Sequence, residues 1–288
     1  MRIPDGRVVA TTDLLVEGKH FRTDWSGPAD VGVKAAAQNL ADVAAMGAQP
    51  RTILVGLACP GELSVEWVLE MVTGMVGECR RAGASIAGGD VTAADRIMLG
   101  VTALGDLAGL QPVTRAGAQL GDDVAVAGRL GWSAAGLALL RAGRAGRAGT
   151  ANRLEAQFAG LVTAHLRPQP PYTAGPAAAR AGATAMIDVS DGLLADLGHI
   201  ASASGVSIDL NAASIPVGDA VAAAAGLLDT DHMDWVLAGG EDHALTATFA
   251  RGTTLPAGWS VIGTVRPGHG VLVDGVSRNG PSGWAHFK

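Results

Sequence analysis

The sequence has few cysteines, few aromatic residues and no long apolar run, and each shortage excludes a class of protein. Cys59 and Cys79 are the two cysteines in 288 residues, which rules out a disulfide framework and gives no zinc-site spacing. Aromatic residues make up 4%, with a single Tyr, which argues against a stacking platform for single-stranded nucleic acid. The apolar run at 221–228 is far shorter than the roughly 20 residues of a membrane span.

The excess of acidic over basic residues is also small. The chain has 21 basic and 27 acidic residues, a net charge of −6, which disfavours a general polyanion-binding surface. The N-terminal segment lacks the apolar core of a secretion signal, since it reads MRIPDG. We therefore expect a soluble, cytoplasmic protein that binds neither nucleic acid nor a membrane.

Apolar runs rich in β-formers alternate with Ala-rich stretches of helical period, a pattern that is typical of an α/β protein. The length fits one large or two ordinary domains. Gly109 and Pro112 interrupt the alternation. We therefore expect one domain at 1–111 and a second at 112–288.

Capping residues mark several of the expected helices. Ser64 and Gly83 would begin and end one helix, and Asp30 and Gly47 another. The basic, Gly-rich stretch 141–150 predicts a surface loop. Helices are expected at 30–46, 64–81, 133–141, 151–166 and 193–203. Strands are expected at 8–12, 52–58, 85–87, 97–104, 123–127, 185–189, 206–210, 244–249, 261–265 and 271–273.

Carboxylates recur beside glycine or hydroxyl residues where apolar runs end. Asp42 joins them from the middle of an expected helix, where Asp is unfavourable and needs another reason to be present. Because ligands of open α/β folds bind at the carboxyl ends of strands, we expect these groups to converge. The groups are Thr11-Thr12-Asp13, Gly88-Gly89-Asp90, Asp188-Val189-Ser190-Asp191-Gly192 and Gly239-Gly240-Glu241-Asp242.

Converging carboxylates repel one another unless cations lie between them or some are protonated. Oxygen ligands without His or Cys partners favour Mg²⁺ over Zn²⁺. Bound magnesium reverses the local field, so that an acidic site can hold phosphate groups. The pattern therefore indicates phosphoryl transfer, in which catalysis is mainly positioning and charge neutralisation.

Each motif taken alone also has a structural interpretation. Gly-Asp and Asp-Gly pairs are ordinary turn residues, and Asp122-Asp123 favours a turn at the entry of a strand. Arg115 would by default be a solvated arginine in a Gly-containing loop. The chain has no P-loop, no protein-kinase motif set and no Gly-x-Ser-x-Gly, so a nucleotide would be held in another way.

Taken together and in order, the motifs closely resemble the thiamine-monophosphate kinases of the aminoimidazole-ribonucleotide-synthetase-like superfamily. The ordered set spans nearly the whole chain and is far more specific than any one motif. The residues that carry the resemblance are TTDLLVEGKHF at 11–21, NLADVAAMGA at 39–48, GGDVT at 88–92, DVSDG at 188–192 and GGED at 239–242.

The resemblance implies an α/β fold with mixed sheets in two domains, an N-terminal ATP-binding and dimerising domain and a C-terminal α/β domain. It implies a homodimer that transfers the γ-phosphoryl group of ATP to thiamine monophosphate, with several Mg²⁺ ions. No side chain needs to act as a strong base, because the accepting phosphate oxygen is already ionised. Carried over by residue, the metal ligands would be Thr11, Thr12, Asp13, Asp42, Asp90, Asp188 and Asp191. The ATP contacts would be Gly89, Asp90, Arg115 and Ser190, and the thiamine phosphate contacts His20, Glu241 and Trp284.

The sequence departs from the family pattern at its start. Family members carry a Gly-Asp-Asp stretch before the Thr-Thr-Asp strand, with further metal ligands and an edge strand, and this sequence starts just after it. One alternative is therefore a shortened, non-catalytic nucleotide-binding or dimer scaffold. Another is a related ATP-dependent synthetase acting on an amide or a selenide. Cys59 and Cys79 do not match the reactive cysteine of selenophosphate synthetases, and the chain lacks the Cys-containing tail of the hydrogenase-maturation relatives.

Overall fold

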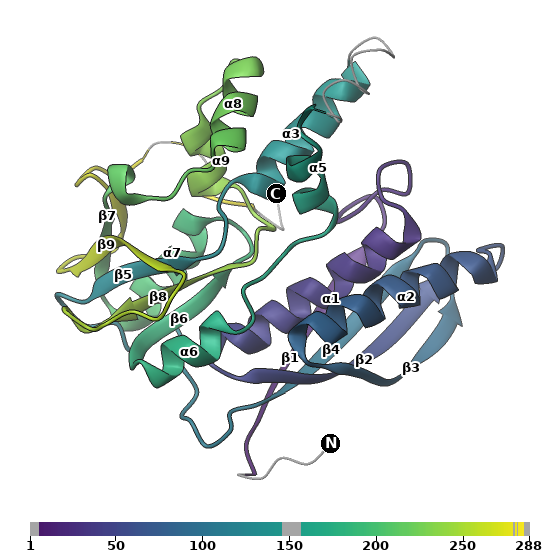
Figure 1. The fold of residues 1–288 in the computed structure, drawn as a ribbon, viewed down its shortest axis with the longest axis horizontal. Helices are drawn as coiled ribbons and strands as arrows, with labels where there is room; N and C mark the ends of the chain where they lie inside the picture. The colour runs from purple at the N-terminus through teal and green to yellow at the C-terminus, as the bar shows by residue number, and fades with distance from the viewer. Residues whose placement is uncertain (1–5, 146–156, 279, 281, 285–288) are drawn as a thin grey trace.

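Two β-sheets with helices packed against them make up the computed structural model (Figure 1). It describes residues 6–145, 157–278, 280 and 282–284. Within these ranges one sheet has four strands and the other six, and each contains both parallel and antiparallel neighbours. The α/β class with mixed sheets is confirmed. None of the described helices is long and apolar enough to cross a membrane.

The N-terminal sheet has the strand order β1-β4-β2-β3, and helices α1 and α2 cover one of its faces (Figure 1). β1 and β2 each run antiparallel to β4, whereas β3 is parallel to β2. The elements are β1 (Val8–Val16), α1 (Pro28–Ala45), β2 (Gln49–Cys59), α2 (Val65–Ala82), β3 (Ser85–Ala93) and β4 (Met98–Asp106).

Local sequence explains where α1 and α2 begin and end. Ser64 caps α2 by accepting a hydrogen bond from the backbone N–H of Trp67 at 3.2 Å, and Gly83 ends it in the left-handed region at φ 76°. The predicted N-cap of α1 is wrong by one turn. Gly27 is the N-cap, and Asp30 lies inside the first turn, where its carboxylate accepts a hydrogen bond from the Gly27 N–H at 2.8 Å.

The C-terminal sheet has the order β10-β7-β9-β5-β8-β6. Its edge strand β6 is antiparallel to β8, and α7 follows directly after β6. The strands are β5 (Asp123–Ala127), β6 (Ala183–Val189), β7 (Ser207–Leu210), β8 (Ala244–Phe249), β9 (Trp259–Arg266) and β10 (Gly270–Val273). The helices are α3 (Trp132–Ala145), α5 (Ala159–Leu166), α6 (Ala174–Arg180), α7 (Leu193–Ser204), η1 (Ala212–Ser214), α8 (Asp219–Leu227) and α9 (His232–Ala238).

Three helices of this half were not predicted, namely α6, α8 and α9. Two of them have seven residues and the third nine, so none gives the long periodic stretch on which the helix predictions depended. The predicted loop at 141–150 is wrong at its start, because α3 continues to Ala145. Its remainder, and residues 151–156 of the predicted helix at 151–166, lie outside the described residues.

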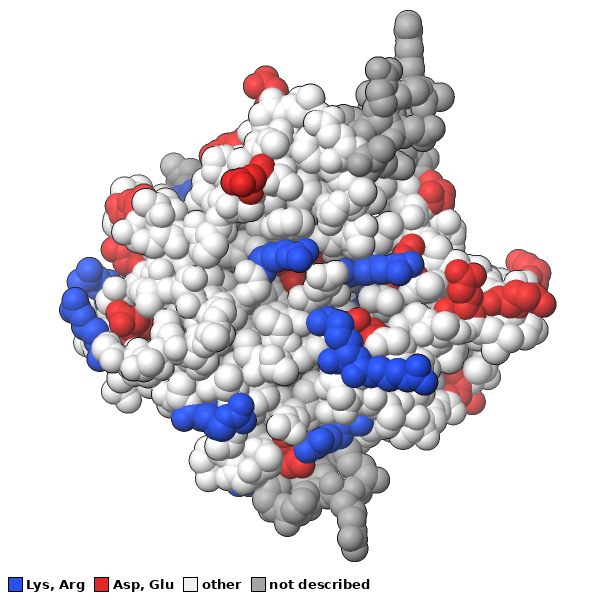
Figure 2. Space-filling view, in the orientation of Figure 1, with Lys and Arg blue, Asp and Glu red and all other residues white. Residues whose placement is uncertain are grey.

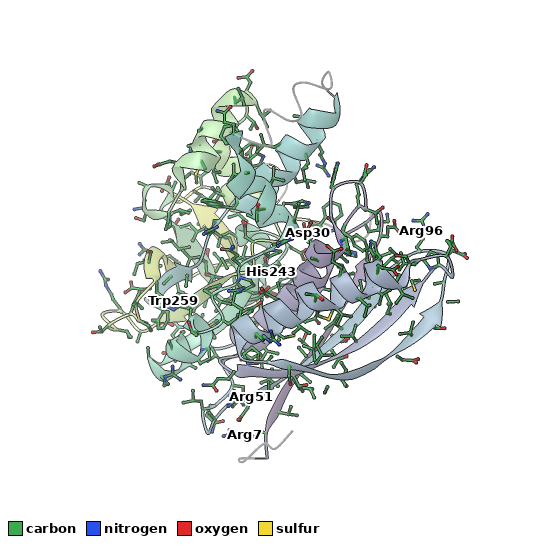
Figure 3. All side chains as sticks on the ribbon, turned by 45° about the vertical axis from the view of Figure 1, so that its right-hand side comes forward. Arg7, Asp30, Arg51, Arg96, His243 and Trp259 are labelled. Carbon is green, nitrogen blue, oxygen red and sulfur yellow. The ribbon has the colours of Figure 1, made fainter. Side chains whose placement is uncertain are left out.

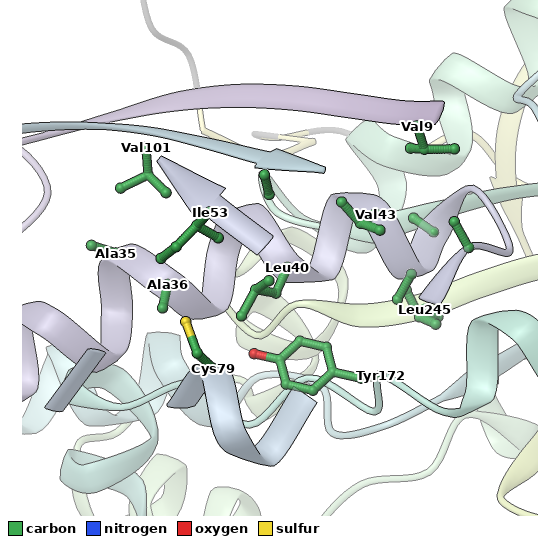
Figure 4. Close-up of a cluster of buried hydrophobic side chains, with 14 of the residues drawn as sticks. Val9, Ala35, Ala36, Leu40, Val43, Ile53, Cys79, Val101, Tyr172 and Leu245 are labelled. Carbon is green, nitrogen blue, oxygen red and sulfur yellow. The ribbon is translucent and has the colours of Figure 1, made fainter. Parts of the chain in front are cut away.

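One hydrophobic cluster joins the two sheets through α1. Leu40 and Val43 of α1 lie in the same buried cluster as Tyr172, and as Leu245 of β8 (Figure 4). At Gly175 a Cβ would lie 1.9 Å from the carbonyl oxygen of Ala44, so α6 and α1 are in close contact. Helix α1 is thereby fixed against both halves.

Candidate active site

The loop between β6 and α7 is held in place by a buried carboxylate. Asp196, in the first turn of α7, accepts hydrogen bonds from the backbone N–H groups of Ser190, Asp191 and Gly192, each at 3.0 Å. At Gly192 φ is 138° and a Cβ would lie 2.9 Å from the backbone of Ala238, so only glycine fits. The positions of Ser190 and Asp191 are therefore fixed.

The segment before β8 lies against this loop, because β8 pairs with β6. The backbone N–H of Glu241 donates to the carbonyl oxygen of Ser190 at 2.7 Å. Buried His243 has its Nδ1 3.0 Å from Oδ2 of Asp188, at the centre of the molecule beside α1 (Figure 3). Glu241 and His243 both adopt left-handed backbone conformations, with φ of 64° and 51°, which is uncommon for residues with side chains.

Strand β1 and helix α1 bring further polar groups to the same edge. The Thr11 hydroxyl donates to Oδ2 of Asp42 at 2.7 Å. Buried Asn39 accepts the backbone N–H of Asp13 at 3.0 Å and donates to the carbonyl oxygen of Ala35 at 3.0 Å. Asp42 therefore lies mid-helix, as predicted, because it faces β1 rather than solvent.

Asp13, Asp42 and Asp188, together called the carboxylate cluster, lie close enough for the charge of Asp188 to act on the other two. Burial raises the pKa of Asp42 to about 8, and the negative charges of Asp188 and Asp13 act in the same direction. The pKa of Asp13 is also raised, by burial first and then by Asp188, while His243 opposes the shift. The cluster thus has more negative charge than its surroundings neutralise.

The donors of the carboxylate cluster fit a hard divalent cation. Carboxylate and hydroxyl oxygens with no thiol are the ligands that Mg²⁺ prefers. Among the described residues, no three His, Cys, Asp or Glu side chains are already arranged to enclose one ion. A cation at this edge would therefore keep water or phosphate oxygens among its ligands, which is usual for magnesium.

The three predicted thiamine phosphate contacts come from distant parts of the chain to the neighbourhood of this edge. His20 lies in the turn after β1, where its Nδ1 accepts the N–H of Val16 at 3.0 Å. Glu241 lies against the Ser190 loop as described above. The backbone N–H of Trp284 donates to the carbonyl oxygen of Asp191 at 2.9 Å, and Trp284 is 58% exposed and so open to a ligand.

The prediction that Asp13 and Asp90 lie at strand ends is wrong. Asp13 lies inside β1 and Asp90 inside β3. Side chains alternate along β1, so Thr12 projects to the opposite face from Thr11 and Asp13, and its hydroxyl donates to the carbonyl oxygen of Val101 at 3.1 Å. It is thus directed away from Asp42, which Thr11 contacts. Gly89 has a structural reason to be glycine, because a Cβ there would lie 1.9 Å from the carbonyl oxygen of Val55.

Asp90 stands apart from the carboxylate cluster within one chain. The register aligns Leu14, Gly100, Gly56 and Asp90 in one row across the sheet. Three strand spacings, about 14 Å, therefore separate Asp90 from β1. A site that uses Asp90 together with Asp13 is not assembled by a single copy of the chain in this conformation.

Arg115 is also remote from the other predicted ATP contacts. Its carbonyl oxygen accepts the hydroxyl of Ser204, the last residue of α7, at 3.1 Å. Ser190 precedes the first residue of the same helix. Since α7 has 12 residues, about 18 Å of helix lie between the two ends. The expected set of Gly89, Asp90, Arg115 and Ser190 does not meet in one chain.

Sequence reasoning missed several polar residues of this region. Asp242, noted as part of a motif, caps α3 by accepting the N–H groups of Gly131 at 2.5 Å and Ser133 at 2.8 Å, and burial raises its pKa to about 7. His243 follows it directly and was not singled out. Lys34, one of three lysines in the sequence, lies 3.1 Å from Glu241. The sequence feature that could have identified Lys34 is that it is a lone lysine in an Ala-rich apolar helix.

The molecular surface in Figure 2 shows basic and acidic side chains close to one another on the face in view. Several lysine and arginine side chains lie near the centre of this face, each with acidic residues nearby. Of the carboxylate cluster, Asp188 is buried, and Asp13 and Asp42 are half-buried.

Comparison with known proteins decides the family. Residues 1–107 match the AIR synthase related protein, N-terminal domain, and residues 119–274 the corresponding C-terminal domain. A thiamine-monophosphate kinase of Mycobacterium tuberculosis is 52% identical over 285 residues, covering 98% of this chain and 82% of the relative. The chain belongs to the thiamine-monophosphate kinase family. A Corynebacterium glutamicum member is 41% identical over 289 residues, covering 99% of this chain and 85% of the relative.

Solved structures of the thiamine-monophosphate kinase family share the fold. The complex of AaThiL with AMPPCP and TMP aligns with a TM-score of 0.89 at 32% identity, covering 100% of this chain and 89% of that one. The thiamine monophosphate kinase from Aquifex aeolicus aligns with a TM-score of 0.86 at 32% identity, covering 96% of this chain and 91% of that one. The predicted two-domain family fold is confirmed.

Proposed function

We propose that the protein transfers the γ-phosphoryl group of ATP to thiamine monophosphate, giving thiamine diphosphate. The observation that carries the proposal is the carboxylate cluster, in a chain that is 52% identical to a thiamine-monophosphate kinase. A related structure holds AMPPCP and TMP, which are an ATP analogue and the candidate acceptor. Transfer between two polyanions explains why uncompensated carboxylates are retained at such a place.

Mg²⁺ is the cation that this donor set fits. Asp13, Asp42, Asp188 and Asp191 would hold it, with the Thr11 hydroxyl beside Asp42. When bound, the ions neutralise the charge on both substrates. The protein's own contribution is to fix its ligands in place. Asp196 fixes the backbone of Asp191, and Asn39 fixes that of Asp13.

No residue of the chain needs to remove a proton in this reaction. The accepting phosphate oxygen is ionised at neutral pH, so positioning of the two substrates is the main requirement. Glu241, His20 and Trp284 would hold the thiamine phosphate, with the exposed indole of Trp284 stacking on a heteroaromatic ring. Ser190 would contact ATP from the fixed loop after β6.

The simplest test is a product assay with purified protein. With ATP, Mg²⁺ and thiamine monophosphate, thiamine diphosphate should form in proportion to enzyme and should be absent when EDTA replaces Mg²⁺. Asp191→Asn should lower kcat by about 100-fold or more, because a lost metal ligand weakens charge neutralisation in the transition state. A well-folded Asp191→Asn protein with near-normal kcat would refute its ligand role, and absence of thiamine diphosphate with the wild-type protein would refute the function.

The homodimer is part of the same proposal. The face of the N-terminal sheet opposite α1 exposes large apolar side chains, Val8 at 49%, Leu14 at 57% and Leu54 at 42%. A second copy packed on this face would cover them. Asp90 shares the register row of Leu14, so it lies at the margin of the proposed interface. Asp90, with Gly89, would then complete the site of the second copy rather than its own.

Mixed dimers test that arrangement. Asp90→Asn and Asp188→Asn should each be inactive alone, whereas random mixing of the two should restore about a quarter of wild-type activity, since half the dimers then have one intact site. If Asp90 acts within its own subunit, no mixture regains activity.

Residues 1–111 and 112–288 remain the proposed domains. Arg115 remains a proposed ATP contact, and the cytoplasm the proposed location.

A further inference from the structure

Lys34 is a buried lysine to which the proposed function gives no role. It lies in the middle of α1, and its side chain is 4% exposed. Lysine is almost never fully buried unless it is paired, because desolvating an ammonium group is costly. Its position therefore requires an explanation from its partners.

The partners of Lys34 are two segments of the candidate thiamine phosphate site. Its ammonium group donates to Oε2 of Glu241 at 3.1 Å and to the carbonyl oxygen of His20 at 3.2 Å. His20 belongs to the turn after β1, and Glu241 to the loop before β8. One side chain of α1 thus connects the two loops that come from opposite halves of the molecule.

Glu241 has a second neighbour, which does not replace the charge of Lys34. Nδ1 of His165 lies 3.5 Å from Oε2 of Glu241 and 3.0 Å from the hydroxyl oxygen of Ser133. Burial lowers the pKa of His165 to about 3, and the charge of Lys34 acts in the same direction. The imidazole is therefore neutral at pH 7. Among the described residues, Lys34 supplies the positive charge within ion-pair distance of Glu241.

The two members of the pair differ in exposure. Lys34 is 4% exposed and Glu241 33%, so the carboxylate is held from inside and open on its outer side. Glu241 also has an unfavourable backbone conformation, with φ 64°, so its neighbours must determine where its side chain points. The contact to Oε2 leaves Oε1 available to a ligand.

We propose that Lys34 is a positioning residue for thiamine phosphate binding, holding Glu241 ionised and aimed at the substrate. The inference rests on the proposed function. Lys34 itself touches neither substrate in this account. It acts through Glu241, and it leaves the ATP contacts unaffected.

The test compares Lys34→Met, which removes the charge at similar length, with Lys19→Met as control. Lys19 is an exposed lysine in the turn that contains His20. In Lys34→Met the KM for thiamine monophosphate should rise about 10-fold or more, while the KM for ATP stays within about two-fold. In Lys19→Met both constants should match the wild type. If Lys34→Met does not fold, the same two KM values are measured for Lys34→Gln.

A double variant separates positioning from general stability. Glu241→Gln already removes the ion pair, so adding Lys34→Met should change the KM for thiamine monophosphate by less than about two-fold. An unchanged KM in Lys34→Met, a parallel rise for both substrates, or additive effects in the double variant would overturn the proposal. These results require an active wild-type enzyme. Failure of the wild type to form thiamine diphosphate would instead overturn the proposed function.

Discussion

Two polar clusters lie along α1, and they differ in how their charge is balanced. The carboxylate cluster combines Asp42 of α1 with Asp13 and Asp188. The lysine cluster combines Lys34 of α1 with Glu241 and neutral His165. Lys34 and Asp42 are eight positions apart, about 12 Å along the helix. Both clusters join the N-terminal half to the C-terminal half.

The difference separates a metal-binding role from a role in positioning a substrate contact. The lysine cluster contains its own counter-charge, so it is complete without a ligand. In the carboxylate cluster the pKa values of Asp13 and Asp42 are raised, and His243 is the partly compensating partner. Burial alone would lower the pKa of His243, but the hydrogen bond and charge of Asp188 raise it above its usual value. Buried like charges that destabilise the fold are retained where a cation offsets them.

The largest expected effect comes from Asp42→Asn, which should affect activity and stability in opposite directions. Turnover should fall by about 1000-fold, because a metal ligand is lost. In EDTA at pH 7 the free energy of unfolding should rise by about 2 kcal/mol, since each unit of raised pKa costs about 1.4 kcal/mol and part of the shift is relieved by the neighbouring groups. Steady-state kinetics and urea unfolding measure the two quantities.

Asp95→Asn is the matched control, because Asp95 is an exposed residue in the turn between β3 and β4. It should change neither turnover nor stability. A loss of stability in Asp42→Asn, measured in EDTA, would show that Asp42 is a structural carboxylate and would remove the distinction between the clusters.

The same change from carboxylate to amide, made in the lysine cluster, should shift the free energy of unfolding in the opposite direction. Glu241→Gln leaves Lys34 buried without its counter-charge, so stability in EDTA should fall by about 1–2 kcal/mol. This is less than for a fully buried pair because Glu241 is 33% exposed and partly screened. Urea unfolding of Glu241→Gln and Asp42→Asn, measured together, gives the direction of both stability changes. If both variants gain or both lose stability, the two clusters do not differ as described.

The effect that is smallest at pH 7 is that of His165, because it develops only at acid pH. Burial lowers its pKa to about 3, while the unfolded chain takes up the proton near pH 6.5. Stability should therefore be lost as the pH falls below about 6.5, by up to about 1.4 kcal/mol per pH unit from this group. In His165→Asn that part of the slope should disappear, whereas His199→Asn, at an exposed position, should retain it. If the free energies of unfolding of His165→Asn and the wild type depend on pH in the same way between pH 6.5 and 4.5, His165 is not the buried neutral group.

Local patterns predicted most of the fold. The helix from Ser64 to Gly83 was predictable because an N-cap, an apolar stripe and a left-handed glycine all agree. Helix α9 was not predicted, because seven residues give too few turns to show a period. Asp13 and Asp90 were placed in turns because glycine and hydroxyl neighbours resemble turn chemistry. In β1 and β3 those neighbours instead serve close strand approach and hydrogen bonds across the sheet.

The candidate site was predicted in part. Asp42 could be found because an Asp inside a helix is unfavourable unless something binds it. The pairing of Asp188 with His243 depends on β6 lying beside β8, which is a long-range contact that no local pattern encodes. Lys34 and His165 were missed for the same reason, because their partners lie far away in the sequence. The separation of Asp90 from the cluster became visible through the strand register alone.

The most direct test of the account is a count of bound divalent ions. Mn²⁺ can replace Mg²⁺ at oxygen sites and its free concentration is measurable by electron paramagnetic resonance. In the presence of AMPPCP and thiamine monophosphate, wild-type protein should bind at least one more Mn²⁺ per chain than Asp42→Asn. Equal numbers bound with equal affinity in the two proteins would contradict the claim that the interior carboxylates hold the metal.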